Sequence, residues 1–60
     1  MTTFERLRRE AGLTQDALAV KSGVSRPVIV KIESGDIDGV TVRTLRRLAD
    51  ALNVTVRELF

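Results

Sequence analysis

A chain of 60 residues is expected to form one domain, residues 1–60, and it contains no cysteine and no histidine. Disulfides, thiolate metal ligands and the commonest general base are therefore excluded, so that we expect neither an enzyme nor a metal or cofactor site. Ten lysine and arginine residues against eight aspartate and glutamate residues give a net charge of +2, which permits a nucleic-acid partner without requiring one.

No apolar run approaches the roughly 20 residues of a membrane-spanning helix, and no signal-peptide pattern opens the sequence. We therefore expect a cytoplasmic protein without a membrane partner. The chain is also too short to enclose a pocket of several hundred cubic ångströms, so that no small-molecule substrate is expected.

The first predicted helix follows Thr2 and ends at Gly12. Thr2 and Glu5 have the spacing of a capping box, in which each side chain accepts a hydrogen bond from a backbone N–H of the other residue. Apolar residues recur at the spacing of one helix face, and these are Phe4, Leu7 and Ala11. Gly12 suits the left-handed backbone with which many helices end.

The second predicted helix begins after Thr14 and ends at Gly23. Thr14 is a favourable N-cap residue, and Asp16 suits the positive end of the helix dipole. The segment "SGVS" then leads to the next predicted helix and is short and glycine-bearing. Such a connection is typical of a helix-turn-helix motif, in which two helices cross at roughly 90–120° over a turn of about 3–4 residues.

The third predicted helix, in "SRPVIVKIESG", begins near Ser25. At about 100° per residue, Ile29 and Ile32 point toward the core and Val28 lies near the boundary. The outward face then consists of Arg26, Pro27, Val30, Lys31 and Ser34. An exposed valine between two cations suits a DNA major groove, where thymine offers a methyl group and guanine offers two acceptors. Alternatively, Val28 and Val30 cover the edge of the core or form a dimer contact.

The fourth predicted helix runs from the N-cap Thr41 to Asn53, which suits a left-handed helix end. Its apolar stripe consists of Val42, Leu45, Leu48, Ala49 and Leu52. Thr55 and Glu58 have the spacing of a second capping box and predict a short fifth helix. No strand pattern of comparable quality occurs, so that the sequence predicts an all-α domain.

The sequence "LRREAGLTQDALAVKSGVSRPVIVKIESG", followed by "LRRLADALNVTVRELF", resembles the Cro/phage-repressor type of helix-turn-helix domain. The resemblance covers about residues 4 to 60. It implies a compact, lambda-repressor-like bundle of five helices that binds double-stranded DNA by docking its third helix in the major groove. It further implies a repressor-like transcription regulator, with a homodimer as one possible assembly.

The resemblance also assigns roles to individual residues. Base-reading positions are occupied by Ser25, Arg26, Pro27, Val30 and Lys31. Positions that contact DNA phosphates are occupied by Gln15, Ser34 and Arg43. Arg8 and Glu33 match a buried ion pair that ties the first helix to the third.

Three features depart from the family pattern, and one of them is a loop after the third helix that is one residue longer than usual. Proline and valine replace the polar residues that are usual at base-reading positions, and Asp36 and Asp38 place negative charge in a loop that would lie near phosphates. These departures are compatible with an altered sequence preference, an engineered protein or a domain that has lost DNA binding. The alternative hypothesis is therefore a protein-interaction module whose third helix binds a partner protein.

Overall fold

The computed structural model describes all 60 residues and contains four α-helices, one 3₁₀ helix and no strand. The elements are α1 (Thr3–Glu10), α2 (Gln15–Ser22), α3 (Arg26–Glu33), α4 (Val42–Leu52) and η1 (Arg57–Leu59). None of the helices combines the length and the apolar character that crossing a membrane requires.

The predicted all-α fold is confirmed, but the predicted count of five α-helices is wrong. The fifth segment is a single 3₁₀ turn, because Glu58 and Leu59 donate backbone hydrogen bonds to the residues three positions earlier instead of four. The expected capping box is nevertheless present, since the backbone N–H of Glu58 donates to Thr55 Oγ1 and the backbone N–H of Thr55 donates to Glu58 Oε1.

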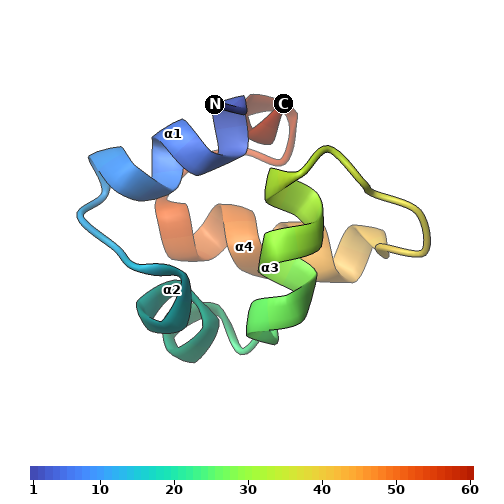
Figure 1. Ribbon diagram of the computed structural model, residues 1–60, viewed down its shortest axis with the longest axis horizontal. Coiled ribbons are helices and arrows are strands. Elements are labelled where there is room, and N and C mark those ends of the chain that lie inside the picture. The colour runs from blue at the N-terminus through green and yellow to red at the C-terminus, as the bar shows by residue number, and fades with distance from the viewer.

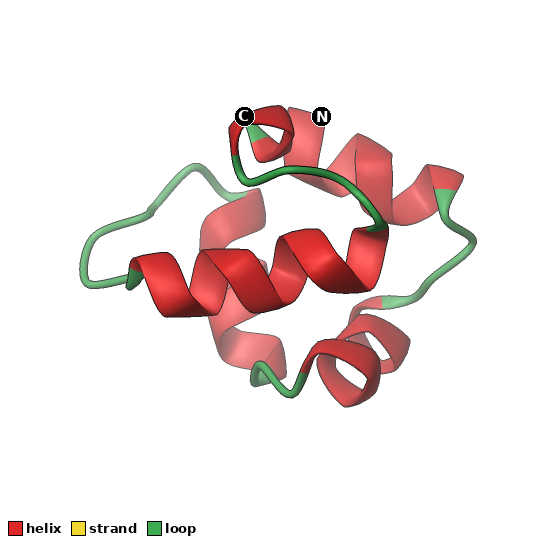
Figure 2. Cartoon of the chain, turned by 180° about the vertical axis from the view of Figure 1, so that it is seen from behind, coloured by secondary structure: helices red, strands yellow, loops and turns green.

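The four α-helices are arranged so that α3 has one face on the core and one face free. In Figure 1, α3 lies in front of α4, with α2 and α1 on one side of it. Figure 2 shows from behind how α4 runs across the molecule, with α1 and η1 along one edge and α2 at the opposite edge. The two chain ends lie close together beside α1 in both views.

A single hydrophobic core holds these helices together. It consists of Phe4, Leu18, Val24, Ile29, Ile32, Leu48, Ala49, Ala51, Leu52 and Leu59. The prediction that Ile29 and Ile32 face inward is confirmed, with exposed fractions of 0% and 2%. Ala11 and Val42 belong to the predicted apolar faces of their helices but are exposed, because each lies at a helix end.

The predicted helix ends are largely confirmed, because they depend on local hydrogen bonds. The side chains of Thr2, Thr14 and Thr41 each accept a hydrogen bond from the backbone N–H three residues later, at 3.1, 3.0 and 3.1 Å. Asn53 ends α4 with a φ of 58° in the left-handed region. Ser25 occupies the predicted N-cap position of α3, but its side chain makes no capping hydrogen bond.

The connection between α2 and α3 fixes how these two helices cross. Gly23 has a φ of 73°, and its N–H donates to the Ala19 carbonyl at 2.9 Å. Val24 follows and is buried in the core, with 6% of its surface exposed. The Ser22 hydroxyl donates to the Leu18 carbonyl at 2.7 Å and accepts the Val24 N–H at 3.1 Å. These contacts build the short turn of a helix-turn-helix motif.

Candidate nucleic-acid interface

The free face of α3 carries most of the residues that the sequence places on the outside. Arg26, Pro27, Val30 and Ser34 are exposed, whereas Val28 is half-buried against the core. Val30 has 43% of its surface exposed, whereas Ile29 beside it on the same helix is fully buried. The outer face of α3 therefore presents a cation, two compact apolar groups and a hydroxyl to its surroundings.

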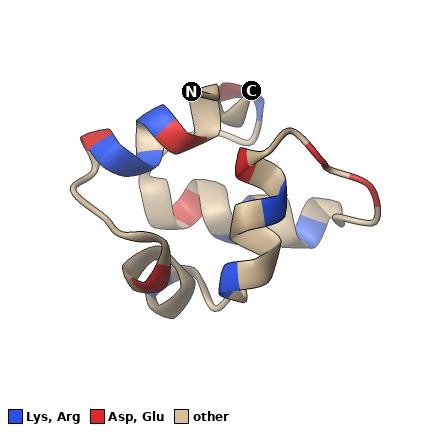
Figure 3. Cartoon of the chain, viewed as in Figure 1, with Lys and Arg blue, Asp and Glu red and all other residues tan.

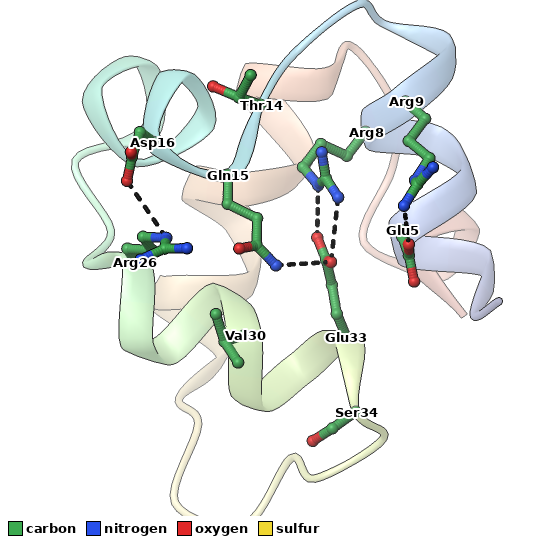
Figure 4. Close-up of a pocket in the computed structure, with 10 residues that line it drawn as sticks. All are labelled: Glu5, Arg8, Arg9, Thr14, Gln15, Asp16, Arg26, Val30, Glu33 and Ser34. Carbon is green, nitrogen blue, oxygen red and sulfur yellow. Dashed lines mark hydrogen bonds and ion pairs between the residues drawn. The ribbon is translucent and has the colours of Figure 1, made fainter.

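An open hollow of about 570 Å³ lies beside this face, between α3, the start of α2 and one side of α1 (Figure 4). Val30 is its one hydrophobic lining residue. The full lining consists of Glu5, Arg8, Arg9, Thr14, Gln15, Asp16, Arg26, Val30, Glu33 and Ser34. A wide and charged hollow of this kind suits the polar surface of a large partner better than a small apolar ligand.

Arg8 and Glu33 form a buried ion pair at the back of the hollow. Arg8 Nε donates to Glu33 Oε2 at 2.6 Å, and Arg8 Nη2 donates to Glu33 Oε1 at 3.2 Å. Arg8 Nη1 also donates to the Leu13 carbonyl at 2.7 Å. Only 9% of the Arg8 side chain and 7% of the Glu33 side chain are exposed. The hydrogen bond to Glu33 raises the pKa of the Arg8 guanidinium above its ordinary value, although burial opposes this rise.

Gln15 joins this buried pair to the start of α2. Its Nε2 donates to Glu33 Oε1 at 3.1 Å, as Figure 4 shows. An amide nitrogen carries two N–H groups, so that one donor of Gln15 stays available to a partner in the hollow. Because Glu33 is itself held by Arg8, the position of the Gln15 side chain depends on contacts from three helices.

A second ion pair crosses the front of the hollow, and sequence reasoning missed it. Arg26 Nε lies 3.3 Å from Asp16 Oδ1, so that the first turn of α2 is linked to the first turn of α3 (Figure 4). Both side chains are largely exposed. Arg26 is the first residue of α3, and Asp16 is the second residue of α2. These positions do not by themselves predict the pair, which depends on how α2 and α3 cross.

Lys31 is oriented differently from the other residues on this face. It is half-buried, and its Nζ donates to the backbone carbonyl of Asp38 in the loop between α3 and α4. Ser34 Oγ donates to the Lys31 backbone carbonyl at 2.7 Å. The loop is therefore fastened to α3 through Lys31, whose ammonium group is engaged within the protein.

The structure brings some of the expected site residues together and leaves others apart. Gln15, Arg26, Val30 and Ser34 share the hollow with the Arg8–Glu33 pair. Four residues lie outside its lining, namely Ser25, Pro27, Lys31 and Arg43. Arg43 is exposed in the first turn of α4 and makes no ion pair.

The distribution of charge around this face is mixed (Figure 3). Lysine and arginine positions lie on α3 and at the start of α4, whereas acidic positions lie in the loop that joins these helices, at the end of α3 and on α2. No three acidic side chains come close enough together to hold a metal ion. Cationic positions on α3 and α4 attract anions, and the acidic positions beside them repel anions.

Comparisons with known proteins agree with the helix-turn-helix fold. The helix-turn-helix family matches residues 4–59 of the chain. A relative from Sinorhizobium fredii (strain NBRC 101917 / NGR234), named Uncharacterized HTH-type transcriptional regulator y4dJ, is 45% identical over 58 residues. That match covers 97% of this chain and 74% of the relative. No solved structure matches the chain significantly.

Proposed function

The chain belongs to the helix-turn-helix family, and we propose on this basis that it binds double-stranded DNA through α3 and regulates transcription in the manner of a repressor. The observation that carries this proposal is the free face of α3, where Arg26 and Val30 stay exposed while Ile29 and Ile32 are buried. An α-helix fits the major groove of B-DNA, so that such a face is able to meet the edges of the bases.

Direct base contacts are assigned to the beginning and the middle of α3. The Arg26 guanidinium is able to donate two hydrogen bonds to O6 and N7 of guanine, the commonest specific contact in the major groove. Val30 and Pro27 offer compact apolar surface to the methyl group of thymine. Ser25 precedes them at the N-cap, where its hydroxyl is not used for capping and stays available to a base or a phosphate.

Contacts with the DNA backbone are assigned to the edges of the same surface. Gln15 begins α2, so that its free N–H and the positive end of the helix dipole both favour a phosphate there. Arg43 at the start of α4 provides a further donor, and Ser34 at the end of α3 provides one when its hydroxyl releases the Lys31 carbonyl. Such contacts fix the position of the protein on the duplex and carry no sequence information by themselves.

Lys31 requires a rearrangement before it reads a base. Its ammonium group donates to the Asp38 carbonyl, so that it reaches the groove only by giving up this hydrogen bond. We therefore rank Lys31 below Arg26 as a source of sequence preference.

A homodimer completes the proposal. Two copies would read half-sites about 34 Å apart, the length of one DNA turn. The longest dimension of the protein is 27 Å, which allows two copies to lie side by side at this spacing.

Selection from a library of random DNA duplexes tests the proposed function. We expect a short motif that contains guanine, and we expect its affinity to fall steeply with salt because bound lysine and arginine release counterions from DNA. The proposal is overturned if the selection enriches no shared motif and the protein binds no DNA at low salt.

The second candidate is a protein-interaction module built on the same fold. Two observations favour it. The loop after α3 carries Asp36 and Asp38, which DNA phosphates repel. The free face of α3 exposes the apolar groups of Val30 and Pro27, which a protein partner would cover. This second function is supported if the protein fails to bind mixed-sequence DNA at both low and moderate salt.

A further inference from the structure

We infer that Asp16 sharpens sequence specificity in the proposed DNA interface by favouring the orientation of the Arg26 guanidinium in which Nε faces the carboxylate. This inference rests on the proposed function, because it concerns how Arg26 selects its base. The carboxylate makes no base contact in this account and acts only through Arg26.

The geometry places the carboxylate behind the reading group. Asp16 Oδ1 contacts Arg26 Nε at 3.3 Å, and no other ion pair is formed by Arg26. The two terminal nitrogens of the guanidinium therefore stay free. They form a planar fork that matches two adjacent acceptors, such as O6 and N7 of guanine. The carboxylate thus attracts the Nε side of the guanidinium and leaves available the terminal donors that a bidentate contact uses.

Exposure argues that this ion pair is not needed to hold the fold. The Asp16 side chain is 80% exposed and the Arg26 side chain is 59% exposed, so that water screens their attraction. The crossing of α2 and α3 is fixed instead by buried residues, including Leu18, Val24 and Ile29. An exposed pair that is dispensable for stability is free to serve recognition.

The position of Asp16 also has a cost for DNA binding. It lies in the first turn of α2, next to Gln15 and in the hollow where a phosphate is proposed to bind. A carboxylate there repels the phosphates of any sequence. Asp16 therefore lowers affinity for all duplexes. At the same time it sharpens the preference for guanine, because a preorganised Arg26 loses hydrogen bonds at any other base.

These opposite effects make the inference testable with Asp16→Asn. We expect this variant to bind mixed-sequence DNA more tightly, and we expect its preference for guanine at the position read by Arg26 to fall by about twofold to fivefold, the range typical of exposed ion pairs. The measurement compares the Kd of two duplexes that differ at this one base pair. Circular dichroism at the assay temperature verifies that the variant is folded.

Asp50→Asn is the matched control, because Asp50 is exposed on α4 and outside the hollow. It raises the net charge by the same amount, so that we expect no change in the guanine preference. Arg26→Lys keeps the charge but removes the planar fork, and in this background Asp16→Asn is expected to leave base preference unchanged.

The outcomes separate the two ideas. If the wild-type protein prefers guanine and Asp16→Asn prefers it equally, Asp16 is no specificity residue while DNA binding stands. If Asp16→Asn reduces the preference and Arg26→Lys abolishes this effect, the inference is supported. If the wild-type protein selects no motif at all, the proposed function fails and the inference fails with it.

Discussion

Arg8 Nε and Glu33 Oε2 lie 2.6 Å apart in the interior, and the same carboxylate accepts a hydrogen bond from Gln15 at 3.1 Å. One buried group thereby links α1, α3 and the first residue of α2. Because Gln15 lines the hollow beside the free face of α3, the ion pair that ties the helices together also positions a proposed phosphate contact.

Glu33→Ala is expected to destabilise the protein strongly. It leaves the Arg8 charge buried without its partner, and such changes lower the free energy of unfolding by about 3–5 kcal/mol. Thermal unfolding followed by circular dichroism measures the loss. The double variant Arg8→Met with Glu33→Leu removes both charges and is expected to be more stable than the single variant. A double variant as unstable as the single one would contradict this account.

The pKa of Arg8 leads to a prediction about pH. The hydrogen bond to Glu33 raises this pKa in the folded protein. The resulting stabilisation is fully present below the ordinary arginine pKa and is lost only as pH rises through the higher folded value. Both values lie far above neutrality. The difference in the free energy of unfolding between the wild type and the double variant Arg8→Met with Glu33→Leu, which leaves no unpaired carboxyl behind, should therefore stay constant from about pH 6 to pH 9.

Urea unfolding at several pH values checks this expectation. The chain contains no histidine, cysteine or tyrosine, so that few other groups titrate within this interval. A difference that shrinks as pH rises through the interval would show that Arg8 loses its proton much more easily than its contacts imply.

Gly23→Ala is expected to lower the free energy of unfolding by about 1–2 kcal/mol, the usual cost of left-handed backbone for a residue with a side chain. Gly23 has a φ of 73°, and an added Cβ would meet no atom within 4 Å, so that the cost is one of backbone conformation alone. Gly23→Asn is the control, because asparagine tolerates this conformation, as Asn53 does in this chain at a φ of 58°. Equal losses for the two variants would contradict the explanation.

The features that could be predicted from the sequence are those that depend on residues close together in the chain. Thr14 and Gly23 bound α2 as expected, because a cap involves groups within three or four positions of one another. The inward direction of Ile29 and Ile32 follows from the helix period in the same way.

The features that could not be predicted depend on how the helices cross and how the loop runs. Asp16 meets Arg26 only because α2 and α3 cross with their first turns close together. Lys31 was expected to point outward, yet its tip bonds to the Asp38 carbonyl, because the loop after α3 passes within reach of it. Neither the crossing nor the path of the loop is encoded in the helix period.

Gln15→Ala is expected to weaken binding to all DNA sequences alike. A phosphate contact carries no base information, and the loss of one hydrogen bond of about 1 kcal/mol raises Kd roughly fivefold. Selection from random duplexes with this variant should return the wild-type motif. A changed motif would show instead that Gln15 reads a base, either directly or through its neighbours in the hollow.

Arg26→Ala and Lys31→Ala are expected to differ in their effects on base preference. Arg26 presents an exposed guanidinium with free terminal nitrogens, so that its removal should cost about 1–3 kcal/mol of discrimination at one base pair. Lys31 must first release the Asp38 carbonyl, and this requirement offsets part of what a base contact would contribute. Measurement of Kd for each variant on duplexes changed one base pair at a time distinguishes the two residues. A larger loss of discrimination for Lys31→Ala would mean that its ammonium group leaves the loop on binding, and Lys31 would then be the main reader of guanine.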